Sequence, residues 1–179
     1  SGYQVLVGLK PNVETGDQWD SGQVKSAQST QVAYGGKGLQ SGQTYYWKVR
    51  YWDKNGRVSP YSAPARFETG LLTSADWKGK FIGGANQLRK EFTLTQRPGR
   101  ARAYIAGLGY YELRINGRKV GRSVLDPAWT TYDKRVLYAS YDVTGLLAQG
   151  PNALGVMLGQ GWYTSRALLL QLNIELELS

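Results

Sequence analysis

The chain has 179 residues, a length that suits one large or two small domains, and it contains neither histidine nor cysteine. These two absences exclude Ser-His-Asp and Cys-His nucleophile systems, disulfide scaffolds and zinc sites built from Cys and His. With 22 Lys and Arg against 13 Asp and Glu the formal net charge is +9, which keeps a polyanion among the candidate partners. No apolar run is long enough to span a membrane, so we expect no membrane partner.

Strand patterns separated by turn signals dominate the first half of the chain. We expect strands over residues 3–10, 30–34, 43–52 and 66–69. The third is the strongest, because its side chains alternate with a period of two and a turn at residues 53–56 follows it. Together these elements predict a hairpin that closes a small sandwich.

The segment from Leu39 to Tyr45 resembles the tyrosine corner of fibronectin type III and immunoglobulin-like sandwiches. This resemblance favours a structural role for Tyr45 over a role in ligand binding. A complete module of this type has about seven strands, whereas only about five can be recognised before Gly70. We therefore expect that the leading strands of the module precede Ser1.

The second half of the chain contains another series of strand patterns. Asn116 and Gly117 supply its strongest hairpin signal, since both accept the left-handed backbone angles of a type I′ turn. The expected strands cover residues 88–94, 101–106, 110–115, 118–121, 136–142, 153–158 and 168–178. No window shows a sustained helical pattern, so the predicted fold class is all-β.

The predicted architecture is two β-sandwiches in series. Residues 1–70 form an incomplete fibronectin type III or immunoglobulin-like module, and residues 71–86 form a linker with a flexible break at Gly83 and Gly84. Residues 87–179 form a larger, jelly-roll-like module of the sugar-binding type.

Positive charge is concentrated in the second half of the chain. Residues 1–76 carry 8 basic and 6 acidic side chains, and residues 77–179 carry 14 and 7. The basic residues occur at most in pairs, such as Arg89-Lys90 and Arg118-Lys119, which favours a solvated surface over a phosphate-binding face. Neither an RNP-type nor a helix-turn-helix motif is present, so we expect no nucleic-acid partner.

Two other candidate motifs are rejected on their pattern. The segments Gly107-Leu108-Gly109 and Gly159-Gln160-Gly161 lack the third glycine and the following helix of a dinucleotide fingerprint. Glu175 and Glu177 could be a pair of catalytic carboxylates, but they alternate with apolar residues as the polar face of a half-buried strand does. No catalytic residue and no metal ligand is therefore assigned.

Acidic and aromatic residues gather in two later segments that lie between strand patterns. Aromatic rings can stack on the apolar face of a pyranose, while carboxylates and amides accept hydrogen bonds from its hydroxyl groups. The same aromatic residues could instead plug the end of the sandwich or pack against another domain, and the sequence leaves both interpretations open. The candidates for carbohydrate binding or a domain interface are Asp126, Trp129, Tyr132, Asp133, Trp162 and Tyr163.

Several linked motifs resemble the N-terminal region of bacterial α-L-rhamnosidases of glycoside hydrolase family 78. In the second half they cover residues 103–113, 115–121, 125–138, 141–144, 152–156 and 159–163. Upstream, residues 19–22, 45–50, 67–72 and 76–77 resemble the immunoglobulin-like module that precedes this region. Relatives usually have a longer loop than residues 164–166 before the last strand, so we expect a loop to be absent from this sequence.

The resemblance implies an enzyme that releases terminal α-L-rhamnose with inversion, using acidic residues in a separate (α/α)6 barrel downstream. No residue here matches the catalytic motifs of that barrel, so we expect this part to be inactive alone. It would assist substrate recognition or support the barrel, with rhamnose-containing glycosides and the downstream catalytic domain as partners. We assign no cofactor, although some sugar-binding modules of the family hold calcium. The alternative is a non-enzymatic adhesion module that binds polyanions or glycans; the compartment stays open.

Overall fold

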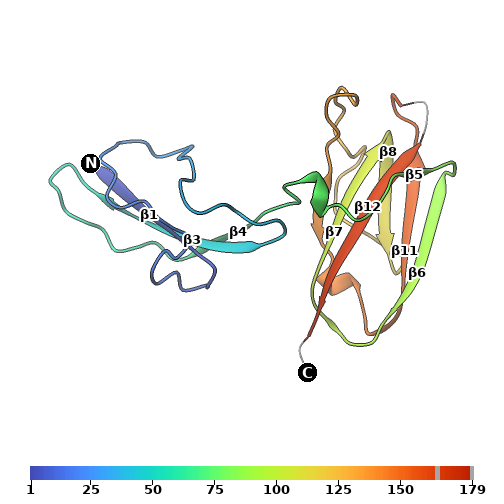
Figure 1. Ribbon diagram of the computed structural model, residues 1–179, viewed down its shortest axis with the longest axis horizontal. Coiled ribbons are helices and arrows are strands. Elements are labelled where there is room, and N and C mark those ends of the chain that lie inside the picture. The colour runs from blue at the N-terminus through green and yellow to red at the C-terminus, as the bar shows by residue number, and fades with distance from the viewer. Residues whose placement is uncertain (164–165, 178–179) are drawn as a thin grey trace. The chain divides into compact units, whose positions relative to one another are not determined.

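The computed structural model describes residues 1–163 and 166–177, which form three antiparallel sheets and two short 3-10 helices (Figure 1). The chain divides into two compact units, Ser1–Asp76 and Trp77–Ser179. In the described part of the chain no helix is long and apolar enough to cross a membrane. The all-β prediction is confirmed, and the domain limits given above stay a prediction.

The first unit contains a single four-stranded sheet with the strand order β2-β1-β3-β4. Its strands are β1 (Gly2–Gly8), β2 (Trp19–Asp20), β3 (Thr44–Trp52) and β4 (Ala65–Glu68). Strand β1 pairs with β3 along its whole length, with Val5 opposite Val49. The 3-10 helix η1 (Ser74–Asp76) ends the unit.

The structural role predicted for Tyr45 is confirmed. Its side chain is buried, and its hydroxyl oxygen accepts a hydrogen bond of 2.8 Å from the backbone N–H of Gln40. The Tyr45 ring also stacks on Phe67 of β4 with 5.3 Å between ring centroids. This tyrosine therefore joins the loop before β3 to the sheet, as the tyrosine corner of immunoglobulin-like sandwiches does.

The strand expected over residues 30–34 is wrong, because this segment is irregular. Gln31 has a positive φ of 56°, which an extended strand does not allow. The backbone carbonyls of Thr30 and Gln31 accept hydrogen bonds from the side-chain amide of Gln28 at 3.0 and 3.1 Å. A side chain thus takes the place of a neighbouring strand as the backbone's partner.

The second unit is a sandwich of two four-stranded sheets. One has the order β10-β7-β12-β5 and the other the order β6-β11-β8-β9. The strands of the first are β5 (Ile82–Gly83), β7 (Pro98–Leu108), β10 (Ala139–Asp142) and β12 (Ala167–Leu176). The strands of the second are β6 (Gln87–Leu94), β8 (Tyr110–Ile115), β9 (Arg118–Lys119) and β11 (Gly150–Gly159).

Alternating side chains from both sheets form the core of the second unit. Ala103 and Ile105 of β7 and Leu113 and Ile115 of β8 are almost fully buried, and Val156 of β11 joins them. The 3-10 helix η2 (Thr144–Leu146) follows β10. Because inward residues alternate with outward ones, each sheet also presents an outer face.

The predicted hairpin between β8 and β9 is confirmed. Asn116 and Gly117 have φ angles of 50° and 80°, as a type I′ turn requires. The last strand was expected to reach residue 178, which lies outside the described residues, as do Thr164 and Ser165 of the expected short loop.

Candidate functional site

Two pairs of aromatic rings bring distant segments of the second unit together. Trp129 stacks on Trp162 with 5.3 Å between ring centroids and 16° between ring planes. Tyr132 meets Tyr163 edge to face, with centroids 5.4 Å apart. Both tryptophans are largely exposed, at 66% and 74% of their surface. Four of the six predicted site residues therefore lie together.

A cavity of about 530 Å³ opens beside these rings, lined by Trp129, Tyr132, Tyr163, Asp133 and two threonines. A turn shapes its wall, because the backbone N–H groups of residues 134 and 135 both donate to the carbonyl of Thr131 at 2.9 Å. Asp133 is exposed, so its carboxylate can accept hydrogen bonds from ligand hydroxyls. The cavity combines apolar ring faces with a carboxylate at its edge.

Asp126 lies outside the lining of this cavity and anchors the segment that leads into it. One carboxylate oxygen, Oδ2, accepts hydrogen bonds from the hydroxyls of Tyr111 at 2.7 Å and Tyr141 at 2.6 Å. The backbone N–H of Tyr111 also donates to the carbonyl of Asp126 at 3.0 Å. The structure therefore holds this residue to the sandwich through both its backbone and its side chain.

The two tyrosine hydroxyls in this network stay protonated over a wide pH range. Burial raises the pKa of Tyr111 above its ordinary value, and the hydrogen bonds to Tyr141 and Asp126 raise it further. Burial also raises the pKa of Tyr141, with the hydrogen bond to Asp126 adding to the effect. A protonated hydroxyl is needed to donate to the carboxylate, so the anchor persists at neutral pH.

Several other carboxylates of the second unit are held by arginine. Glu175 pairs with Arg100 at 2.6 Å, and Asp142 pairs with Arg102 at 2.9 Å. Glu175 thus has a structural partner on the neighbouring strand. In residues 1–163 and 166–177 no group of three or more metal-binding side chains is found.

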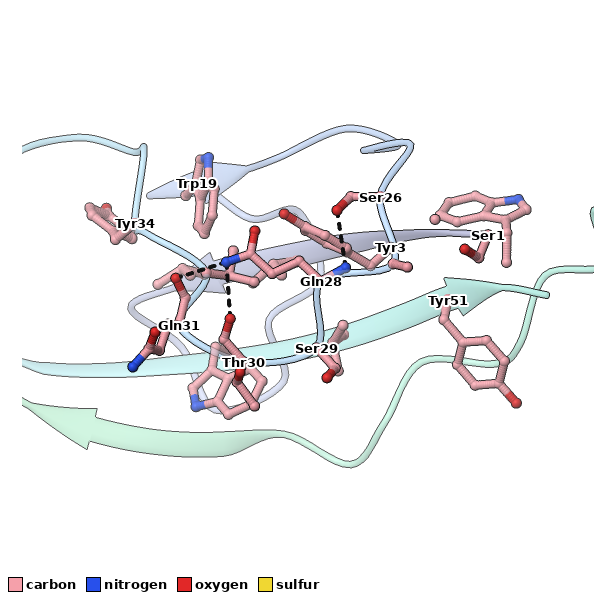
Figure 2. Close-up of a pocket in the computed structure, with 18 of the residues that line it drawn as sticks. Ser1, Tyr3, Trp19, Ser26, Gln28, Ser29, Thr30, Gln31, Tyr34 and Tyr51 are labelled. Carbon is pink, nitrogen blue, oxygen red and sulfur yellow. Dashed lines mark hydrogen bonds between the residues drawn. The ribbon is translucent and has the colours of Figure 1, made fainter. Parts of the chain in front are cut away.

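Another cavity, of about 690 Å³, lies on one face of the sheet in the first unit and was missed by the sequence analysis. Its floor comes from β1 and β3 and includes Val5, Val49 and Trp47. Figure 2 shows Gln28 extended along one side of it, hydrogen-bonded to Ser26. The lining contains aliphatic, aromatic, hydroxyl and amide side chains and no charged one, so it offers apolar contact rather than acid-base chemistry.

The alternating aromatic residues of β3 indicate this cavity, but they predict only a strand when the sequence is considered alone. Strand β3 carries aromatic residues at alternating positions, and two of them, Trp47 and Tyr51, remain 37% and 61% exposed. We expected the segment at residues 30–34 to be another strand of the module. Instead it is part of an irregular stretch that lines the cavity.

Comparison with known proteins links both units to one kind of enzyme. Residues 96–174 match the family described as the alpha-L-rhamnosidase N-terminal domain. Residues 1–73 match the family described as the Rha78A-like, N-terminal immunoglobulin domain. The two matches leave residues 74–95, which include β5 and β6, and residues 175–179 uncovered.

Individual relatives agree with these matches. An alpha-L-rhamnosidase of Formosa agariphila is 38% identical over 196 aligned residues, which cover 91% of this chain and 21% of the relative. The solved alpha-L-rhamnosidase of Dictyoglumus thermophilum superposes with a TM-score of 0.92 at 39% identity, over 98% of this chain and 23% of that one. For the enzyme of Aspergillus terreus the TM-score is 0.81 at 32% identity, over 97% and 23%. The chain spans about a fifth of the length of the curated relatives it matches.

Proposed function

We propose, because the chain belongs to the α-L-rhamnosidase family and matches the N-terminal domains of its members, that it is the accessory part of an enzyme that hydrolyses terminal non-reducing α-L-rhamnose from glycosides. The hydrolysis itself is assigned to an (α/α)6 catalytic domain outside these 179 residues. The role of this part is to assist substrate recognition.

The observation that carries this role is the exposed stack of Trp129 on Trp162 beside an open cavity. Burying an exposed tryptophan normally stabilises a protein, so a pair left in solvent favours contact with a ligand. L-Rhamnose has a methyl group where most hexoses have a hydroxymethyl group, which gives it an apolar edge. Such a sugar gains from contact with an aromatic surface, and its ring hydroxyls still need polar partners.

The remaining site residues have distinct roles in this proposal. Tyr132 and Tyr163 form the second wall of the cavity, and their hydroxyls can donate to or accept from the sugar. Asp133 accepts hydrogen bonds from sugar hydroxyls at the edge of the cavity. Asp126 is a positioning residue, because it fixes the start of the segment that carries Trp129.

A supporting role for the catalytic domain is the second candidate function. The segment before Asp126 exposes Val124 and Leu125 at 77% and 71% of their surface. Apolar side chains this exposed favour burial against another domain. The apolar face that bears Trp47 in the first unit has a different expected partner: the further strands of an immunoglobulin-like module would close it.

Calorimetric titration with L-rhamnose and with rhamnosides, each with and without calcium, tests the recognition role. We expect heat of binding at millimolar ligand, and at least tenfold weaker binding in a W129A variant. A W77A variant is the matched control, because Trp77 packs against Tyr138 and Tyr104 and does not line the cavity. No heat at millimolar ligand would leave only the supporting role.

A further inference from the structure

The same tripeptide, Asn-Gly-Arg, occurs twice in the chain, at residues 55–57 after β3 and at residues 116–118 after β8. An asparagine before glycine is open to attack on its side-chain amide by the next backbone nitrogen, because glycine has no side chain to shield that nitrogen. Gly56 and Gly117 have almost the same φ, 79° and 80°, and a Cβ atom on either would meet nothing within 4 Å. Both asparagines are exposed. A difference in reactivity must therefore come from the hydrogen bonds at each site.

The side chain of Asn116 is fixed by three hydrogen bonds. Its Nδ2 donates to the carbonyl of Leu146 at 3.0 Å and to Oδ1 of Asn152 at 2.9 Å. Its Oδ1 accepts from the backbone N–H of Ala153 at 2.9 Å. Asn152 is buried and is itself bonded to the backbone of Ala148. The amide carbon of Asn116 therefore cannot turn toward its own backbone unless these bonds break.

The side chain of Asn55 lacks such restraints. In residues 1–163 and 166–177 its amide has no hydrogen-bond partner, although its backbone N–H donates to Oδ1 of Asp53 at 2.8 Å. The backbone N–H of Arg57 donates to the same oxygen at 2.9 Å. The turn is thus held through its backbone, which leaves the Asn55 amide to rotate. Only the hydrogen bond from the Gly56 N–H to the Asp53 carbonyl, 3.1 Å long, must open before the Gly56 nitrogen can react.

We propose that Asn55 is a site of spontaneous conversion from amide to acid, and that Asn116, in the same tripeptide, is protected from it. The Gly56 nitrogen forms a bond to Cγ of Asn55, and the bond from Cγ to Nδ2 breaks. The proton of the Gly56 nitrogen leaves with the amide nitrogen as ammonia, and a cyclic imide remains. Water then adds to either carbonyl of the imide and opens the ring. The product at position 55 is an aspartate or an isoaspartate, whose carboxylate replaces a neutral amide.

The conversion to isoaspartate should loosen the turn, because it adds a carbon atom to the backbone. The turn leads into a segment that pairs with β3. The backbone N–H of Ser59 donates to the carbonyl of Tyr51 at 2.9 Å, and that of Ser62 to the carbonyl of Val49 at 2.8 Å. No residue of this turn lines the cavity beside Trp129. The inference therefore does not depend on the proposed recognition of rhamnose, and rhamnose binding should be the same before and after conversion.

Peptide mapping of the whole chain during incubation in mildly alkaline buffer tests the proposal. Chymotryptic peptides that contain each tripeptide are followed by mass spectrometry in the same sample, with fragmentation that separates aspartate from isoaspartate. We expect conversion at Asn55 to be at least tenfold faster than at Asn116, since each hydrogen bond that must break slows the reaction. Its rate should rise with pH, because the deprotonated Gly56 nitrogen is the nucleophile.

The same chain unfolded in urea is the matched control. Because the two tripeptides are identical, both asparagines should then convert at similar rates. Equal rates in the folded chain, or faster conversion at Asn116, would overturn the proposal. So would a folded chain in which Asn55 stays intact while the unfolded chain converts at both sites.

Two variants assign the difference to the residues named. N55Q should remove the conversion at the first site and leave the rate at Asn116 unchanged. N152A removes an acceptor of the Asn116 amide, so conversion at Asn116 should become about tenfold faster while the rate at Asn55 stays the same. An unchanged rate at Asn116 in folded N152A would contradict protection by these bonds. Thermal unfolding shows whether N152A is folded; if it is not, the comparison of folded and urea-unfolded native chain decides.

Discussion

Replacing Asp126 with alanine should destabilise the second unit, because the carboxylate joins the loop to the sandwich. The substitution removes two hydrogen bonds, from the hydroxyls of Tyr111 and Tyr141. The Tyr111 side chain is almost fully buried, so its hydroxyl would keep only the 3.2 Å contact with the Tyr141 hydroxyl.

The expected loss follows from these contacts. Hydrogen bonds to a charged group contribute about 1.5–3 kcal/mol each, and here they share one oxygen of a partly exposed carboxylate. We therefore expect the free energy of unfolding to fall by about 2–3 kcal/mol in D126A. For a domain of this size that lowers Tm by about 10 °C.

Differential scanning calorimetry of D126A, Y141F and the double variant measures the effect and its coupling. Y141F should lose about 1 kcal/mol, and the double variant should lose less than the sum because both changes remove the same contact. D133A is the matched control: Asp133 is an exposed carboxylate in the same loop, and its loss should leave Tm unchanged. If D126A unfolds at the same temperature as D133A, the anchoring role of Asp126 is refuted.

Three further outcomes are expected. Y45F should lower the free energy of unfolding of the first unit by about 1 kcal/mol, because the Gln40 amide loses its acceptor, while Y51F at an exposed position should change nothing. The pKa values of Tyr111 and Tyr141 are raised in the folded protein, so the unfolded tyrosines ionise first and the free energy of unfolding should fall as pH rises above about 10. Thermal unfolding across about pH 9 to 11 should show this fall as a lower Tm. The Tm of a Y141F variant should fall less over the same range. The 179-residue chain should not turn over an aryl α-L-rhamnoside, and any turnover above a buffer blank would place catalytic residues within it.

The features that the sequence predicted correctly depend on local chemistry. Asn116-Gly117 specifies a tight turn because both residues tolerate a positive φ, and the structure shows that φ at both. Tyr45 could be interpreted from its place at the start of an alternating strand, after the turn at Gly42. The expected strand at residues 30–34 failed because Gln28 satisfies the backbone there through its side chain, and a pattern of apolar residues does not reveal such a partner.

The parts of the site that could not be predicted depend on contacts between distant segments. Sequence alone named Trp129 and Trp162 as separate candidates, but their stacking follows from two loops meeting at one place on the sandwich. For the same reason Asp126 was grouped with the ligand-binding residues, although its carboxylate accepts from two tyrosines of the sandwich.

The most direct test of the central claim is a titration with L-rhamnose followed through the indole N–H resonances of the six tryptophans by NMR. The account predicts that the Trp129 and Trp162 resonances shift together with one saturation curve. The other four, Trp19, Trp47, Trp52 and Trp77, serve as internal controls and should not move. Unchanged Trp129 and Trp162 resonances at saturating sugar, or shifts confined to the other tryptophans, would contradict a rhamnose site at the aromatic pair.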